Sequence, residues 1–234
     1  MAMKSSLNIK GIMIDFGDTL AYTDKEAYGR YVQEIFALVR NNRHDLHSDD
    51  VKSTFNALYR SSSKGEMKDL PEFWSVFLEK LNIPDQKDLI DELIEARNRF
   101  YIPAVRLYDE VASTLSMLQK KCVLALVSNC GVGTIDVIKA LGLAEFFEHI
   151  ILSYEVKVRK PDKRIYVEAL RRIGMKADEC MFVADEISDL EGAKKLGMRT
   201  LLIRQGSNTL CEAEDPDFKP DFQCEHISEI TKFL

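Results

Sequence analysis

The feature that most constrains this fold is a series of short apolar segments, separated by longer stretches with helical periodicity. The segments are rich in Val, Ile or Leu, as strands buried on both faces should be, and they cover residues 11–14, 122–127, 150–152, 181–184 and 200–203. Helical patterns cover residues 134–141, 161–173 and 188–197. Strands that alternate with helices predict an α/β fold with a doubly wound parallel sheet and right-handed crossovers.

Local signals predict where these helices begin and end. Gly142 and Gly174 follow the first two helical patterns and predict C-terminal stops. Pro161 is expected at the first helical position of its segment. Ser188 and Glu191 have the spacing of a capping box, which predicts a helix start at Ser188.

A helical insertion is expected between the first and second apolar segments. Apolar residues recur at helical spacing through residues 31–39, 55–59, 73–81 and 89–94, and no strand signal interrupts them. This predicts a helical bundle over 22–104, inserted into a core domain made of residues 1–21 and 105–234.

Composition excludes several classes of protein. The net charge is −6, from 32 Lys+Arg and 38 Asp+Glu, which argues against binding nucleic acid or an anionic membrane through charge. No apolar stretch approaches the roughly 20 residues of a membrane span, and no secretory signal is evident at the start. The five cysteines form no C-x-x-C pair, and a reducing, cytoplasmic location fits them best.

Chemically suggestive residues follow the predicted strands. Asp15 ends the first strand, Ser128 and Asn129 end the second, and Asp185 ends the fourth. Lys160 stands before a helix, and Asp189 lies one helical turn after Asp185. Because ligands bind at the carboxyl edge of such sheets, these residues are expected to converge there.

The group is suited to an anion held by a cation. Neighbouring carboxylates repel one another unless a cation lies between them, and oxygen ligands without His or Cys favour Mg²⁺. Lys160 and Ser128 would then hold a phosphate, and Asp15 could act as a nucleophile. Taken singly, each Asp is more simply a turn or capping residue and Lys160 a solvated charge.

Four ordered motifs resemble the haloacid dehalogenase-like (HAD) hydrolase superfamily. They are I-D-F-G-D-T-L at 14–20, V-S-N at 127–129, R-K-P-D at 159–162 and A-D-E-I-S-D at 184–189. The resemblance covers nearly the whole chain. It implies a Rossmann-like core and a helical cap of the subgroup whose cap follows the first motif.

The resemblance also implies roles for the site residues. Asp15 would be the nucleophile that forms an aspartyl intermediate, Ser128 would bind a phosphoryl oxygen, and Lys160 would balance the charges of nucleophile and phosphate. Thr19 would help to set the loop after the strand, and with Asn129 it completes the expected substrate-binding set.

The implied cofactor is Mg²⁺. Asp15, the backbone carbonyl of Gly17 and Asp185 would bind the metal, and Asp189 would support it directly or through water.

One departure from the family pattern concerns acid–base catalysis. HAD phosphatases usually carry a second Asp two residues after the nucleophile, where this chain has Gly17. Asp18 follows it and is interpreted as a turn residue that points away from the usual place. Losing a general acid typically costs about 10²–10⁴-fold in rate.

Three functions remain open. The leading hypothesis is a Mg²⁺-dependent phosphatase of a small phosphorylated metabolite, acting as a monomer or homodimer. A 2-haloacid dehalogenase is the second, but dehalogenases of this pattern carry Ser where this chain has Asp185. A binding protein that has lost efficient turnover is the third. Four residues after the first motif are candidate substrate contacts: Lys25, Tyr28, Arg30 and Tyr31. Solvent exposure is the simpler explanation for Lys25 and Arg30, and packing within the cap is the simpler one for Tyr31.

Overall fold

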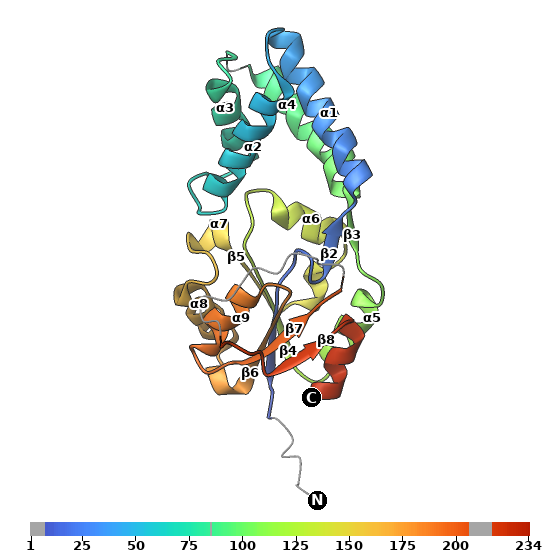
Figure 1. The fold of residues 1–234 in the computed structure, drawn as a ribbon, viewed down its shortest axis with the longest axis vertical. Helices are drawn as coiled ribbons and strands as arrows, with labels where there is room; N and C mark the ends of the chain where they lie inside the picture. The colour runs from blue at the N-terminus through green and yellow to red at the C-terminus, as the bar shows by residue number, and fades with distance from the viewer. Residues whose placement is uncertain (1–7, 85, 206–216) are drawn as a thin grey trace, which may run out of the picture.

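A six-stranded parallel sheet forms the centre of the lower body in Figure 1. The structure is a computed structural model that describes residues 8–84, 86–205 and 217–234. The strand order is β5-β4-β1-β6-β7-β8. The bounds are β1 Gly11–Ile14, β4 Val123–Ser128, β5 His149–Leu152, β6 Cys180–Ala184, β7 Arg199–Ile203 and β8 Phe222–Cys224. The predicted α/β class and parallel sheet are therefore confirmed.

Helices cover both faces of this sheet, because successive strand residues point to opposite sides. Ile12 and Ile14 belong to an apolar cluster with α5 (Val111–Leu118), α6 (Thr134–Ala140) and the 3₁₀ segment η5 (Ile227–Phe233). Met13 belongs to a second cluster with α8 (Lys163–Ile173) and α9 (Ile187–Lys194). The sheet is thus doubly wound. Shorter turns complete the core: α7 Ser153–Val156, η3 Ala144–Phe146 and η4 Ala177–Glu179.

A helical bundle stands beyond one end of the sheet, as Figure 1 shows. Its entry and exit are β2 (Ala21–Thr23) and β3 (Val105–Leu107), which pair antiparallel. Between them lie α1 Lys25–Asn42, α2 Ser48–Ser62, α3 Leu70–Lys80, α4 Lys87–Ala96, the π-helical turn η1 Arg97–Tyr101 and the 3₁₀ turn η2 Ile102–Ala104. The bundle has an apolar cluster of its own, centred on Trp74, Phe77 and Leu93.

Capping side chains explain several helix ends. Asp24 accepts a hydrogen bond from the Ala27 N–H at the start of α1, and Asp69 accepts one from the Glu72 N–H at the start of α3. Gly174 adopts a left-handed φ of 68° where α8 ends, which is the conformation that favours glycine at this position.

Several sequence predictions need correction. Residue 161 is not the first helical residue, because α8 begins at Lys163 with Asp162 as its capping residue. Ser188 lies inside α9, which begins at Ile187 after the short connection from β6, so the predicted capping box is wrong. The strands β2, β3 and β8 were not predicted, because three residues each are too few to establish a periodicity.

The predictions for individual cysteines are confirmed where the structure covers them. Cys122 and Cys180 are buried free thiols packed among apolar residues. Cys211 lies outside the described residues. Within the described ranges, no helix is long and apolar enough to cross a membrane.

Candidate active site

The candidate site lies at the carboxyl edge of the three central strands. Strand β1 pairs with β4 on one side and with β6 on the other. Asp15 directly follows β1, Ser128 ends β4, and Asp185 directly follows β6. All three side chains are largely buried. The topology therefore brings together three residues that lie far apart in the sequence.

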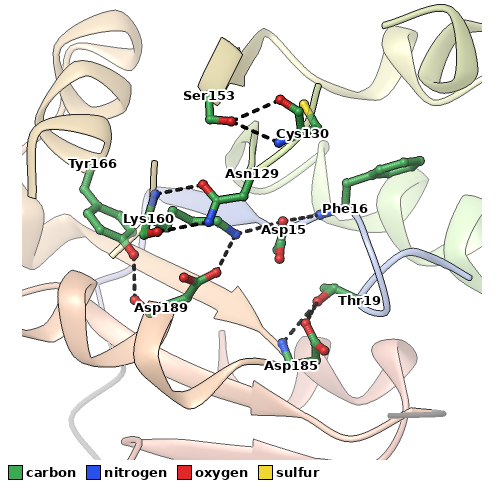
Figure 2. A network of polar contacts seen from close by, with 10 residues as sticks. All are labelled: Asp15, Phe16, Thr19, Asn129, Cys130, Ser153, Lys160, Tyr166, Asp185 and Asp189. Carbon is green, nitrogen blue, oxygen red and sulfur yellow. Dashed lines mark hydrogen bonds and ion pairs between the residues drawn. The ribbon is translucent and has the colours of Figure 1, made fainter. Parts of the chain in front are cut away.

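Lys160 is the charged centre of this group. Its ammonium Nζ lies 2.8 Å from Asp15 Oδ1 and 2.7 Å from Asp189 Oδ2 (Figure 2). Burial alone would lower the pKa of Lys160, but the two carboxylates outweigh it and raise that pKa above its usual value. Lys160 therefore stays protonated at neutral pH and contacts the Asp15 side chain.

Asn129 fixes the main chain of Lys160. Its Nδ2 donates to the Lys160 carbonyl at 3.0 Å, and its Oδ1 accepts from the Lys160 N–H at 2.8 Å. The amide that was expected to bind substrate is thus engaged with the protein itself. In this structure Asn129 positions Lys160.

Thr19 connects the loop after β1 to the loop after β6. Its hydroxyl donates to Asp185 Oδ1 and accepts from the Asp185 N–H, both at 3.1 Å. The Thr19 carbonyl accepts from Gln205 Nε2 at 2.7 Å. These contacts agree with the expected loop-setting role of Thr19. Its side chain, which was also expected to bind substrate, is fully buried and bonds Asp185.

The electrostatics of the site suit a cation. Burial and the charge of Asp15 raise the pKa of Asp185 to about 7. Burial also raises the pKa of Asp189 to about 6, although Lys160 opposes that shift. Asp189 Oδ1 is buried and has no hydrogen-bond partner among the described residues. A divalent cation would relieve the repulsion between Asp15 and Asp185, so this donor set fits Mg²⁺.

The side chains of the expected metal ligands do not form a complete metal site by themselves. Across the described ranges, no three His, Cys, Asp or Glu side chains form a cluster that would hold a metal. One oxygen of Asp189 is taken by Lys160. The donors that remain are the carboxylates of Asp15 and Asp185 and a main-chain carbonyl such as that of Gly17, which is a common set for Mg²⁺ because this ion keeps several water ligands.

The turn after β1 contains the departure from the family pattern. Asp18 has a left-handed φ of 53°, and its N–H donates to the Ala21 carbonyl at 2.7 Å, so its predicted role as a turn residue is confirmed. Burial, and then the charge of Asp15, raise the pKa of its carboxyl. Gly17 is exposed, and a Cβ built on it would meet nothing within 4 Å.

Two supporting residues were missed by the sequence analysis. The Tyr166 hydroxyl donates to the Asp189 carbonyl at 2.8 Å and so holds the first turn of α9 (Figure 2). Gly192 packs against the Pro161 carbonyl, which would lie 2.6 Å from an added Cβ. No local signal marks either residue, because both contacts join segments more than twenty residues apart.

Taken together, a buried aspartate that is paired with a lysine at the carboxyl edge of a doubly wound sheet defines an α/β protein with a candidate nucleophile at its ligand-binding edge. The chain belongs to the haloacid dehalogenase-like hydrolases, whose family model matches residues 9–197.

Relatives by sequence carry two kinds of name. The chain is 26% identical to a glyceraldehyde 3-phosphate phosphatase of Methanopyrus kandleri, over 95% of each chain. It is 27% identical to (S)-2-haloacid dehalogenase 4A of Burkholderia cepacia, over 93% of this chain and 96% of the relative. Both are hydrolases, so the chain is a hydrolase of the phosphatase or dehalogenase kind.

Solved structures confirm the fold. A 2-haloacid dehalogenase from Pseudomonas syringae superposes with a TM-score of 0.69 at 23% identity, covering 96% of this chain and 97% of the other. A HAD phosphatase from Thermococcus onnurineus gives 0.68 at 21% identity, with the same coverage.

Proposed function

We propose that this protein is a Mg²⁺-dependent phosphatase that acts on a small phosphorylated metabolite through an aspartyl-phosphate intermediate. The observation that carries the proposal is the buried pair Asp15 and Asp185 at the ends of adjacent strands. Burial, and then the charge of Asp15, raise the pKa of Asp185 to about 7. A cation bound between them would sit beside the nucleophile. The family pattern supports this choice, since metal-independent dehalogenases carry Ser at the position of Asp185.

Asp15, Asp185 and the Gly17 carbonyl are the proposed metal ligands, and Asp189 supports the metal directly or through water. When bound, Mg²⁺ would neutralise charge on the phosphoryl group and on the two carboxylates.

The chain's own residues account for the transfer step. Asp15 attacks phosphorus, the bond from phosphorus to the ester oxygen breaks, and the alkoxide leaves with a proton taken from solvent. Lys160 and Ser128 hold the phosphoryl oxygens. Water then hydrolyses the phosphoaspartate and restores Asp15. Lys160 stays protonated throughout because the carboxylates of Asp15 and Asp189 raise its pKa.

Residues 22–104 are proposed to form a cap domain that encloses the substrate. Two features support this division: the bundle has a separate apolar cluster, and its boundaries fall at the β2–β3 ribbon. Residues 1–21 and 105–234 form the catalytic core in this proposal.

Hydrolysis of p-nitrophenyl phosphate with Mg²⁺ and with EDTA tests the function. We expect turnover only with the metal, and none in the Asp15→Asn protein. Asp178→Asn is the matched control, because this carboxylate is exposed in η4, which precedes β6, whereas Asp185 follows the other end of that strand. Turnover that persists in EDTA or in Asp15→Asn would contradict the proposal.

A 2-haloacid dehalogenase is the second candidate, and Gly17 favours it because dehalogenases lack the second carboxylate of the phosphatases. In that reaction Asp15 would attack carbon and displace halide. Halide release from 2-chloropropionate in EDTA would support this candidate. Tight phosphate binding without turnover of either substrate would instead favour a binding protein on the same scaffold.

A further inference from the structure

A cavity of about 440 Å³ lies between the helical bundle and the loop that follows Asn129. Helices α1, α2, α3 and the turn η1 form its walls, and Val132 and Thr134 form its side toward the core. None of the catalytic candidates Asp15, Ser128, Lys160 and Asp185 lines it. The cavity therefore lies beside the group of catalytic candidates and does not include them.

Seven of the fifteen residues that line this cavity are aromatic. Two come from each of α1, α2 and α3 and one from η1, namely Tyr28, Tyr31, Phe55, Tyr59, Phe73, Trp74 and Tyr101. Several are in ring-to-ring contact, with centroids 5.4 Å apart for Tyr31 and Tyr101 and 5.2 Å apart for Phe73 and Trp74. Such walls favour a flat ring, which can stack or meet them edge to face.

Hydrogen-bond donors face the same space. Burial raises the pKa values of Tyr28, Tyr31 and Tyr101, and within the described residues none of these hydroxyl groups donates to another group. The Arg97 guanidinium lies 5.8 Å from the Tyr101 ring centroid and donates to the Gly133 carbonyl. Arg97 thus ties the wall to the core loop, while the three phenols remain available to an acceptor on a ligand.

The cavity is next to the catalytic centre along the loop after β4. The Val132 N–H donates to Ser62 Oγ at 2.9 Å, which fixes this loop against α2. Earlier in the loop, burial raises the pKa of the Cys130 thiol to about 12. The charge of Asp15 also raises this pKa, and the charge of Lys160 opposes the rise. Burial raises the pKa of the Tyr59 hydroxyl, and the charge of Cys130 adds to that rise. Asn129 bonds the Lys160 main chain, and Val132, three residues later, lines the cavity, so this short loop joins the catalytic centre to the aromatic wall.

We infer that this cavity receives the leaving group of the substrate, and that the leaving alcohol carries an aromatic or heteroaromatic ring with a hydrogen-bond acceptor. This inference rests on the proposed phosphatase function. A ring would fill a compartment of this size and meet its seven aromatic side chains, whereas a hydrophilic three-carbon chain would leave most of the wall uncovered. The substrate class therefore differs from glyceraldehyde 3-phosphate, which the names of several relatives specify.

Binding can be measured without turnover, because Trp74 is the only tryptophan of the chain and lines the cavity. The Asp15→Asn protein is titrated with 2-phenylethyl phosphate and, separately, with propyl phosphate, in Mg²⁺. We expect a saturable change in tryptophan fluorescence with the first compound, at an affinity about tenfold or more higher than with the second. Equal affinities, or no change with either compound, would overturn the inference.

Turnover by the wild-type protein gives the second readout. The two phosphates have alkoxide leaving groups of similar basicity, so a higher kcat/KM for 2-phenylethyl phosphate reports the ring. Tyr59→Ala removes a ring that is 40% exposed, and we expect it to lower that kcat/KM by about tenfold and to lower the kcat/KM for propyl phosphate by much less. Phe36→Ala is the matched control, because Phe36 lies on α1 outside the cavity lining.

The two proposals fail in different ways. Saturable binding of the ring compound without turnover of any phosphate, p-nitrophenyl phosphate included, would sustain the ligand class and reject the phosphatase. Equal kcat/KM for the two phosphates, unchanged by Tyr59→Ala, would sustain the phosphatase and reject the aromatic leaving group.

Discussion

Lys160 shows how single residues build this site. It is held at its side chain by Asp15 and Asp189 and at its main chain by Asn129, which lies 31 positions earlier. Each contact is short, and each partner comes from a different strand end or helix. One ammonium group therefore faces two carboxylates, so the site keeps an excess of negative charge beside Asp185.

Asn129→Ala should lower activity by acting on Lys160. The change removes both hydrogen bonds to the Lys160 main chain, so Nζ loses its fixed position between the carboxylates. We expect kcat to fall by about tenfold or more, with the fold retained. Steady-state kinetics measure this effect. Asn42→Ala is the control, because the exposed Asn42 side chain donates to the Leu38 carbonyl within α1. An unchanged kcat would show that Asn129 does not position Lys160.

Gly17→Asp should increase hydrolysis of esters with poor leaving groups. The position has room, since a Cβ there meets nothing within 4 Å, and the added carboxyl would restore the acid that phosphatases of this family carry. A general acid contributes about 10²–10⁴-fold, and we expect a gain toward the lower end of that range for an alkyl phosphate and little gain for p-nitrophenyl phosphate.

The control for this change is Gly17→Asn, which has the same size but cannot donate an acidic proton. Equal rates for Gly17→Asp and the parent protein, with correct folding by circular dichroism, would indicate that another group already supplies the proton.

At the scale of elements, the sequence predicted what is periodic and missed what is not. The strands β1, β4, β5, β6 and β7 agree with the predicted segments to within one residue at each end, because runs of Val, Ile and Leu identify them. The ribbon β2–β3 and strand β8 have no such run. The start of α9 was also misplaced, since the connection from β6 rather than a capping side chain sets it.

The residues of the site also divide into those that the sequence could predict and those that it could not. Motif residues such as Asp15 and Asp185 were predictable, because topology places the ends of adjacent strands together. The direction of the Asn129 amide and the support from Tyr166 depend on packing between distant segments, which spacing in the sequence does not encode.

Gly192→Ala tests the packing of α9 against the segment that carries Lys160. The added Cβ would lie 2.6 Å from the Pro161 carbonyl, so α9 must move away and take Asp189 with it. We expect a loss of about 1–3 kcal/mol in the free energy of unfolding and a lower kcat. Denaturant unfolding and steady-state kinetics measure the two effects.

Gly29→Ala is the matched control, because Gly29 lies within α1 and its Cβ would meet nothing within 4 Å. Alanine there should stabilise the protein by about 0.5–1 kcal/mol. If both alanine variants were equally stable, close packing at Gly192 would not be what positions α9.

At the scale of the whole molecule, the helical bundle and the core meet at a few polar contacts. Ser153 Oγ donates to the Ser63 carbonyl at 2.8 Å, Ser62 accepts from Val132, and Arg97 lies 3.6 Å from Asp136. These contacts flank the aromatic cavity, so the bundle and the core together enclose it. The proposed metal ligands, in contrast, all belong to the core.

Mg²⁺ should therefore raise the thermal stability of the molecule through the core carboxylates. A ligand at a hundred times its Kd stabilises the folded state by about 2.7 kcal/mol, which corresponds to a rise in Tm of roughly 5–10 °C for a chain of this length. Asp185→Asn should abolish that rise, because it removes one of the two carboxylates that repel each other without the cation. Asp178→Asn should retain it. Differential scanning calorimetry with Mg²⁺ and with EDTA gives the comparison. A Tm that is the same in both, or a rise that persists in Asp185→Asn, would place the metal elsewhere.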